Sequence, residues 1–261
     1  MKILFISSFP PSKHNLGVPS ALNYYLIKNK PSYVKVIDLL YVEGFETMES
    51  QFKNDLNKMF SKVYKIKIKY SDIIFYKVLD FFKIKHDFYG SAYRCLPRKE
   101  LKNKIIKKYD FIWIYPCVMY PWKQLVSASQ RCMITTPDCS LLHYELALKI
   151  YPKSTQIRSK LNKDPQIKNL DALYNQSLFR ENEIANSKSI IHVVGVDDLK
   201  RYNTINPNKT DVFFSPHPIS DFKKKSNYFQ NNKISILISG TNHSIYNGDY
   251  IDKVIKVILK N

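Results

Sequence analysis

Short apolar runs recur along the chain, and polar loops or prolines separate most of them. They consist mainly of isoleucine, valine, leucine and aromatic residues in nearly unbroken order, a pattern typical of strands that are buried on both faces of a sheet. The strands predicted in this way are Lys2 to Ser8, Tyr33 to Leu40, Phe111 to Pro116, Cys132 to Thr136, Ile190 to Val194 and Val212 to Ser215.

Stretches with helical spacing lie between the predicted strands. The first one follows the opening strand through a proline-containing loop. The predicted helices are Val18 to Asn29, Thr47 to Lys83 in two or more segments, Pro121 to Ser129, Leu141 to Tyr151 and Ile167 to Ser187. Alternation of strand and helix predicts an α/β fold with a doubly wound, Rossmann-like parallel sheet, whose ligands bind beyond the carboxyl ends of the strands.

A polar stretch rich in proline, lysine and asparagine interrupts this alternation late in the chain. It is interpreted as an interdomain linker over residues 216–232, so that residues 1–215 form a large Rossmann-like domain. Residues 233–261 then open a second, incomplete domain with one strand, Lys233 to Ser239, and one helix, Tyr250 to Lys260. A single strand and helix cannot bury their own apolar faces, so this segment is expected to pack on the first domain or to need further chain.

The composition indicates a globular cytoplasmic protein. Hydrophobic residues make up 44% of the sequence and only 6 residues are glycine, which argues against disorder, collagen-like repeats and a disulfide-rich miniprotein. No apolar run approaches the roughly 20 residues that span a bilayer, and the opening strand is not followed by a cleavage-site pattern. The 4 cysteines stand at unrelated spacings without a CxxC pair, as expected for reduced thiols in the cytosol.

The formal net charge is +19, and most of the excess is lysine interleaved with isoleucine, tyrosine and asparagine. Such a charge attracts nucleic acid, anionic lipid head groups or diphosphate-bearing substrates, whereas biased codon usage would produce the same lysines without any ligand. Lys62 to Lys69 is interpreted as a solvated helix face, with a basic amphipathic surface as the alternative. A noncatalytic basic module that binds anionic membrane or nucleic acid is therefore the competing interpretation of the chain.

The loop after the opening strand is a candidate anion-binding site. It contains His14, Asn15 and Gly17 and leads into a helix, whose free amide groups attract negative charge. The loop lacks both the GxGxxG and the GxxxxGK[ST] pattern, so it predicts neither a dinucleotide fingerprint nor a P-loop. An ordinary strand-to-helix connection is the alternative.

A second polar segment follows the strand Cys132 to Thr136. Asp138 lies where this strand ends and the next helix begins, in the crevice expected at the carboxyl edge of the sheet. It is our first choice for a catalytic residue, with Ser140 and His143 as neighbouring candidates. The alternative is that Asp138 or Ser140 caps the helix that begins at Leu141.

Aromatic residues and cysteines near these segments have both functional and structural interpretations. Tyr120 and Trp122 follow a strand end, where an aromatic face can stack on a sugar or an isoprenoid chain, although burial in a core is the commoner role. No metal site is predicted, because Cys132 lies within a strand and Cys139 and His143 have no fourth ligand at zinc-site spacing. GxSxG and HExxH patterns do not occur.

Several segments, taken in order, resemble a known enzyme family. The opening MKILFISSFPPSKHNLGVPSALNYYL is similar to the start of GT-B glycosyltransferases of the large retaining family that uses nucleotide sugars, with a strand, a proline-rich loop and a glycine before the first helix. Tyr109 to Tyr115 and Ser189 to Asp197 resemble two later strands, Asp211 to Pro218 resembles the crossover to the donor domain, and Ile234 to Lys260 resembles the start of that domain.

The resemblance implies an enzyme that transfers a sugar from a nucleotide-sugar donor to a glycan or lipid-linked acceptor, without a cofactor or a required metal. By position, Asp138, Ser140 and His143 would contact the acceptor, and Gly240 and Asn242 would contact the donor across the cleft. The acidic E-x7-E element of the family's donor domain is missing, so we expect a truncated transferase or a subunit whose donor half comes from a partner chain. Peripheral contact with anionic membrane fits this interpretation, and nucleic acid is not an expected partner.

Overall fold

The computed structural model describes residues 1–11, 20–43, 56–82, 84, 96–137, 140–150 and 170–216. The chain divides into two compact units, one formed by Met1–Leu141 with Ala172–Pro218 and the other by Leu142–Asp171 with Ile219–Asn261. Apart from Pro216, the predicted linker at residues 216–232 and the predicted second domain at residues 233–261 lie outside the described residues. The sheet and the helices that cover it belong to the first unit.

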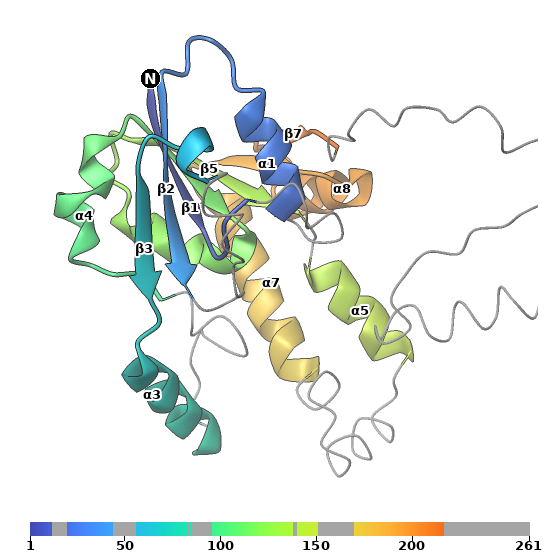
Figure 1. Ribbon diagram of the computed structural model, residues 1–261. Coiled ribbons are helices and arrows are strands. Elements are labelled where there is room, and N and C mark those ends of the chain that lie inside the picture. The colour runs from blue at the N-terminus through green and yellow to red at the C-terminus, as the bar shows by residue number, and fades with distance from the viewer. Residues whose placement is uncertain are drawn as a thin grey trace, which may run out of the picture. The chain divides into compact units, whose positions relative to one another are not determined.

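A seven-stranded parallel sheet forms the centre of this first unit (Figure 1). Its strands lie in the order β3-β2-β1-β4-β5-β6-β7, and every neighbouring pair runs in the same direction. The predicted α/β class with a doubly wound parallel sheet is therefore confirmed, and the order is Rossmann-like. The strands are β1 (Lys2–Ser7), β2 (Val36–Glu43), β3 (Val63–Lys67), β4 (Phe111–Tyr115), β5 (Arg131–Thr136), β6 (Ile190–Val193) and β7 (Val212–Phe214).

Helices cover both faces of the sheet, as a doubly wound fold requires. Ile27 of α1 packs on one face, whereas Ile106, Trp122, Ile184 and Tyr202 pack on the other. The described helices are α1 (Ser20–Lys28), α3 (Tyr70–Phe81), α4 (Leu101–Lys104), α5 (Ser140–Ile150), α7 (Leu170–Asn186) and α8 (Val196–Ile205), with the 3-10 segments η2 (Ile106–Lys108) and η3 (Cys117–Leu125).

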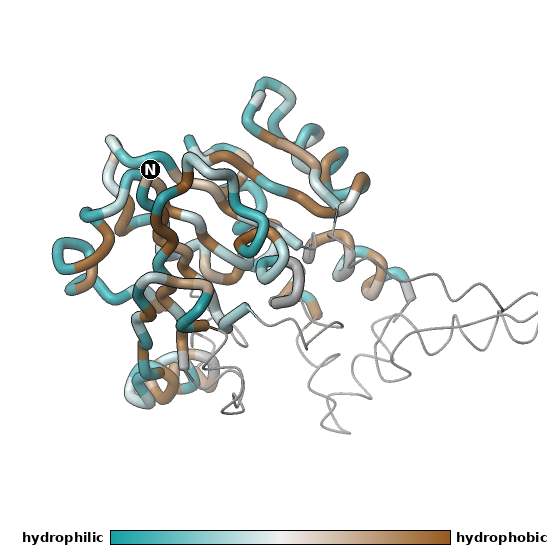
Figure 2. Tube along the Cα trace, turned by 45° about the horizontal axis from the view of Figure 1, so that its top comes forward, coloured by the Kyte–Doolittle hydropathy of each residue, from teal (hydrophilic) through white to brown (hydrophobic). Residues whose placement is uncertain are grey.

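Successive residues of each central strand face two separate hydrophobic cores. In β1, Leu4 and Ile6 belong to the core under η3 and α7, and Ile3 and Phe5 belong to the core under α1. Figure 2 shows the resulting apolar segments running through the middle of the sheet. Burial on both faces explains why the strands appear in the sequence as nearly continuous apolar runs.

The strand β3 was not predicted, and the interpretation of Lys62 to Lys69 as a helix face is wrong. Within the predicted helical region Thr47 to Lys83, residues 56–59 and α3 are helical, but Val63–Lys67 between them pairs with β2 at the edge of the sheet. Lys65 and Lys67 are exposed and Ile66 between them is buried, so the pattern has the period of a strand. Lysines on an edge strand also oppose pairing with another chain.

The helix predicted at Pro121 to Ser129 differs from the observed segment in bounds and in type. The segment η3 begins at Cys117, directly after β4, and has the 3-10 geometry common in connectors. The observed strand β2 likewise starts and ends three positions later than predicted, at Val36 and Glu43. The helices predicted near α1, α5 and α7 agree with the structure within a few residues at each end.

One carboxylate lies inside the core and is held by a tyrosine. Asp38 on β2 is buried, and its Oδ2 accepts a hydrogen bond of 2.5 Å from the Tyr109 hydroxyl. Burial, followed by this hydrogen bond, raises the pKa of Tyr109 well above its ordinary value of 10.0. Tyr109 therefore stays protonated and acts as a fixed donor to the carboxylate.

Candidate functional site

The strand order places a topological switch point at the carboxyl edge of the sheet, between β1 and β4. The chain leaves β1 toward β2 on one side and leaves β4 toward β5 on the other, so this is the switch point at which ligands of doubly wound folds bind. The register pairs Ser7 with Tyr115 at this edge, and the backbone N–H of Ser8 donates to the Tyr115 carbonyl over 3.2 Å. These strand ends form the floor of the candidate site.

Local contacts fix the shape of this floor. The Ser7 hydroxyl donates to the Phe9 carbonyl over 2.6 Å and accepts the Phe9 N–H over 3.4 Å, so it closes its own turn. The rings of Phe9 and Tyr115 meet edge to face, with centroids 5.8 Å apart, and the Tyr115–Pro116 peptide bond is cis. The strand ends are therefore supported by packed aromatic rings and by backbone and hydroxyl hydrogen bonds, with Tyr115 itself buried.

Most of the residues predicted for the site are not placed by the structure. Ser140 and His143 are described in their backbone alone, where Ser140 is the first residue of α5 and His143 lies in its first turn. Because α5 follows the carboxyl end of β5, both residues lie on the connection that was predicted to border the crevice. The others lie outside the described residues: His14, Asn15, Gly17, Asp138, Gly240 and Asn242.

A carboxylate from a distant helix binds the N-terminus of α5. Glu181 of α7 is buried, and its Oε1 accepts a hydrogen bond of 2.8 Å from the backbone N–H of Leu141. A negative charge is favourable at this end of a helix. The sequence pattern indicated only Asp138 and Ser140 as caps, because capping patterns are local and Glu181 lies 40 residues away. This amide group is consequently already satisfied by protein.

A buried hydrogen-bonded chain crosses the sheet from β4 to β6. The indole N–H of Trp113 donates to Thr135 Oγ1 over 2.8 Å, and Thr135 Oγ1 lies 3.0 Å from Nδ1 of His192. Nε2 of His192 lies 3.3 Å from the Ser215 carbonyl, which can only accept, so Nε2 carries the proton. In the neutral ring the Thr135 hydroxyl then donates to Nδ1. His192 was noticed in the sequence only as part of a strand motif.

Two polar side chains near the carboxyl edge are buried without a hydrogen-bond partner in the part of the chain that the structure describes. They are the amide of Asn23 in the first turns of α1 and the hydroxyl of Thr136, the last residue of β5. Both residues are 0% exposed. Unpaired buried polar groups lower stability, so each of them is a position where stability could be gained by mutation.

Replacing Asn23 with leucine is expected to raise the free energy of unfolding by about 1–2 kcal/mol, because a side chain of similar volume removes two unpaired polar atoms. Urea denaturation measures the change. Asn29→Leu, at an exposed position just after α1, is the matched control and should change stability by less than about 0.5 kcal/mol. A clear loss of stability in Asn23→Leu would show that the Asn23 amide forms hydrogen bonds in the folded protein.

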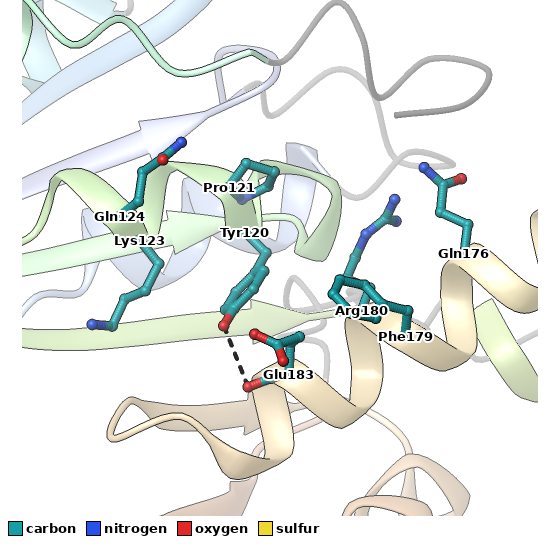
Figure 3. A pocket seen from close by; sticks show the side chains of 8 residues that line it. All are labelled: Tyr120, Pro121, Lys123, Gln124, Gln176, Phe179, Arg180 and Glu183. Atoms are coloured by element: carbon teal, nitrogen blue, oxygen red, sulfur yellow. Dashed lines mark hydrogen bonds between the residues drawn. The ribbon is translucent and has the colours of Figure 1, made fainter. Parts of the chain in front are cut away.

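A cavity of about 440 Å³ lies between η3 and α7 (Figure 3), within the roughly 300–1,000 Å³ typical of small-molecule sites. Its wall contains the aromatic rings of Tyr120 and Phe179 together with the amide and guanidinium groups of Gln124, Gln176 and Arg180. Figure 3 shows Gln176 and Arg180 extending to the same side of α7. Such a wall can hold a polyhydroxylated molecule by ring stacking and hydrogen bonds.

The two aromatic residues singled out after β4 have different environments. The Tyr120 hydroxyl donates to the Glu183 carbonyl over 3.3 Å, and burial, followed by the Glu183 carboxylate, raises the pKa of Tyr120 to about 12. Tyr120 therefore lines the cavity as a neutral donor. Trp122 is 0% exposed and lies in the core, so it is not available for stacking on a ligand.

The described cysteines are Cys117 and Cys132, and neither of them forms a disulfide bond. Cys132 lies inside β5 as predicted, and burial raises the pKa of its thiol to about 11, so it is protonated at neutral pH. Among the described residues, no group of three or more histidine, cysteine, aspartate or glutamate side chains is arranged to hold a metal ion.

Comparisons with protein-family models, with curated proteins and with solved structures found no match to this chain. The class of protein is therefore defined by the fold alone. It is an α/β protein with a seven-stranded, all-parallel, Rossmann-like sheet and a switch point between β1 and β4.

Proposed function

We propose that this chain forms the acceptor-binding half of a glycosyltransferase that uses a nucleotide-sugar donor. The observation that carries the proposal is the doubly wound parallel sheet with its switch point between β1 and β4, because the resemblance of residues 1–26 to GT-B enzymes implies this architecture. A fold alone hosts many activities, so the proposal depends on the residues at the carboxyl edge.

In this proposal the acceptor binds along the ends of β1, β4 and β5. Asp138, two residues beyond β5, is the catalytic residue, and Ser140 and His143 orient the acceptor. The Leu141 amide at the N-terminus of α5 is satisfied by Glu181, so the diphosphate of the donor needs other partners. The loop containing His14, Asn15 and Gly17 and the segment containing Gly240 and Asn242 supply them.

The proposal assigns residues 233–261 to the donor side of the site. Closing the two halves around the substrates excludes water, which prevents hydrolysis of the donor and strengthens the electrostatic contacts to the departing diphosphate. The proposal predicts that residues 1–215 bind a glycan or lipid-linked acceptor.

Isothermal titration with a panel of nucleotide sugars and with oligosaccharides chosen from a glycan array tests this proposal. We expect glycan binding that Asp138→Asn weakens about tenfold, since a hydrogen bond to a charged group contributes about 1.5–3 kcal/mol. Asp211→Asn is the matched control, because Asp211 is exposed and precedes β7, at the amino edge of the sheet.

Two results would contradict the proposal. The first is tight, specific binding of a nucleotide sugar with no binding of any glycan, which would assign the donor rather than the acceptor to this chain. The second is glycan binding that Asp138→Asn and Asp211→Asn change equally, which would place the acceptor away from the carboxyl edge.

A further inference from the structure

The helix α3 is apolar on nearly all sides, yet none of its described side chains is buried. It directly follows the edge strand β3, and Figure 1 shows it continuing beyond the end of that strand. A helix with apolar residues all round is normally enclosed by protein or by lipid. The described part of the chain therefore does not enclose α3 in protein.

The two sides of α3 differ in what they contact. On the inner side, Asp72 forms an ion pair of 2.6 Å with Arg98, whose second guanidinium nitrogen lies 3.4 Å from the Lys67 carbonyl. Arg98 thus ties the start of α3 to the end of β3. Ile73 and Leu79 are half-buried on this side. These contacts hold the helix in place and leave its other side to solvent.

The outer side carries an apolar surface, which we call the α3 surface. Tyr70 and Phe81 are 78% and 80% exposed, and the least exposed member, Val78, is still 45% exposed. Soluble proteins rarely expose a continuous apolar patch of this kind unless it binds a partner or a membrane. The α3 surface consists of Tyr70, Ile74, Phe75, Val78, Phe81 and Phe82.

Exposed lysines lie on β3 and α3, close in sequence to the α3 surface. Lys65 and Lys67 are exposed on one face of β3, Lys62 and Lys69 flank that strand, and Lys77 is exposed on α3 itself. Exposed aromatic and aliphatic side chains next to lysines match the two layers of a membrane surface, in which acyl chains lie beneath anionic head groups. The lysine stems can also extend so that the ammonium groups reach the head groups.

We propose that the α3 surface and the lysines of β3 dock this protein onto an anionic membrane. The apolar side chains of α3 enter the boundary between head groups and acyl chains, and Lys65 and Lys67 contact the lipid phosphates. A second copy of the chain is a poorer occupant, since a two-fold interface would bring the same lysines of both copies together. The proposal is independent of the proposed sugar transfer.

Docking in this way is peripheral and does not need a membrane span. α3 has 12 residues, fewer than the roughly 20 required to cross a bilayer. Among the residues that the structure describes, no helix has the length and apolar character of a transmembrane segment. The carboxyl end of β3, from which α3 emerges, lies at the same edge of the sheet as the switch point between β1 and β4. A docked protein would thus hold its candidate site near the membrane.

Vesicle flotation with the full chain tests the proposal. Vesicles of phosphatidylcholine alone are compared with vesicles that also contain phosphatidylglycerol, each at low and high salt. We expect binding to the anionic vesicles, and we expect the double variant Phe75→Ser with Phe81→Ser to lower the partition coefficient about tenfold or more, because two aromatic side chains no longer leave water.

Matched controls distinguish vesicle binding through the α3 surface from nonspecific adsorption of the protein. Tyr33→Ser with Phe179→Ser removes two exposed aromatic residues elsewhere and should leave vesicle binding unchanged. Lys65→Gln with Lys67→Gln should weaken binding to anionic vesicles mainly at low salt, whereas Lys104→Gln with Lys107→Gln, also exposed, should not. Circular dichroism confirms that each variant is folded.

The proposal is overturned if the unmodified chain does not bind anionic vesicles, or if both aromatic double variants bind equally well. It is also overturned if the chain is a dimer that the α3 variant dissociates without any vesicle binding, because a second copy would then cover the surface. Asp138→Asn should keep vesicle binding, so failure of the proposed sugar transfer remains distinguishable from failure of membrane docking.

Discussion

Replacing Thr135 with valine is expected to lower the free energy of unfolding by about 2–4 kcal/mol, although the two side chains have nearly the same shape. The Thr135 hydroxyl is the acceptor for the indole N–H of Trp113 and the neighbour of His192 Nδ1. Valine leaves both of these buried groups without this partner, and each unsatisfied group costs about 1–3 kcal/mol. Urea denaturation followed by circular dichroism measures the loss.

The next residue of the same strand provides the control for this prediction. Thr136 is also 0% exposed, but within the described part of the chain its hydroxyl has no hydrogen-bond partner. Thr136→Val should therefore leave stability unchanged or raise it by about 1 kcal/mol. Equal losses of stability in Thr135→Val and Thr136→Val would contradict the hydrogen-bonded chain from Trp113 through Thr135 to His192.

Replacing Trp122 with alanine is expected to lower the free energy of unfolding by about 3–5 kcal/mol, the largest effect that we predict for a single side chain. Trp122 is the largest of the fully buried side chains and lies among Met119, Leu125 and the inner residues of the sheet. Its removal leaves a cavity that the surrounding strands cannot fill without distortion. Because natural domains are stable by only about 5–15 kcal/mol, much of the variant is expected to be unfolded at moderate temperature.

A more conservative change keeps this prediction measurable. Trp122→Phe should lose clearly less stability than Trp122→Ala, because part of the buried ring is retained. Phe179→Ala, at a position that is 54% exposed on the wall of the cavity, should cost less than about 1 kcal/mol. If Trp122→Ala lowered the free energy of unfolding as little as Phe179→Ala, Trp122 would not be a core residue and its ring could contact a ligand.

If both proposals hold, the α3 surface and the candidate acceptor site have complementary roles. A lipid-linked acceptor is anchored in a membrane, and an enzyme docked through α3 meets it in two dimensions instead of in bulk solution. Binding of such an acceptor should then depend on the α3 surface even though the proposed acceptor contacts lie at the ends of β1, β4 and β5. Binding of a soluble glycan at the carboxyl edge should not depend on it.

The sequence by itself determined the class of the fold. The apolar runs at Lys2 to Ser8, Phe111 to Pro116 and Cys132 to Thr136 became β1, β4 and β5 of a parallel sheet, because burial on both faces requires continuous apolar residues. The position of Asp138 just beyond β5 follows from the same pattern. The roles of Asp138, His14 and Gly17 in the candidate site stay predictions, since these residues lie outside the described residues.

Only the tertiary structure decided which distant groups meet and which apolar groups remain exposed. Val63–Lys67 became the edge strand β3 because β2 offers it a hydrogen-bonded neighbour, although its lysines had favoured a solvated helix. Glu181 of α7 accepts a hydrogen bond from the N-terminus of α5, and Thr135 lies next to His192 because β5 and β6 are neighbours in the sheet. The exposure of α3 was likewise invisible in its apolar sequence. The local hydrophobic periodicity indicates which residues favour burial, whereas the packing of the whole chain determines whether they are buried.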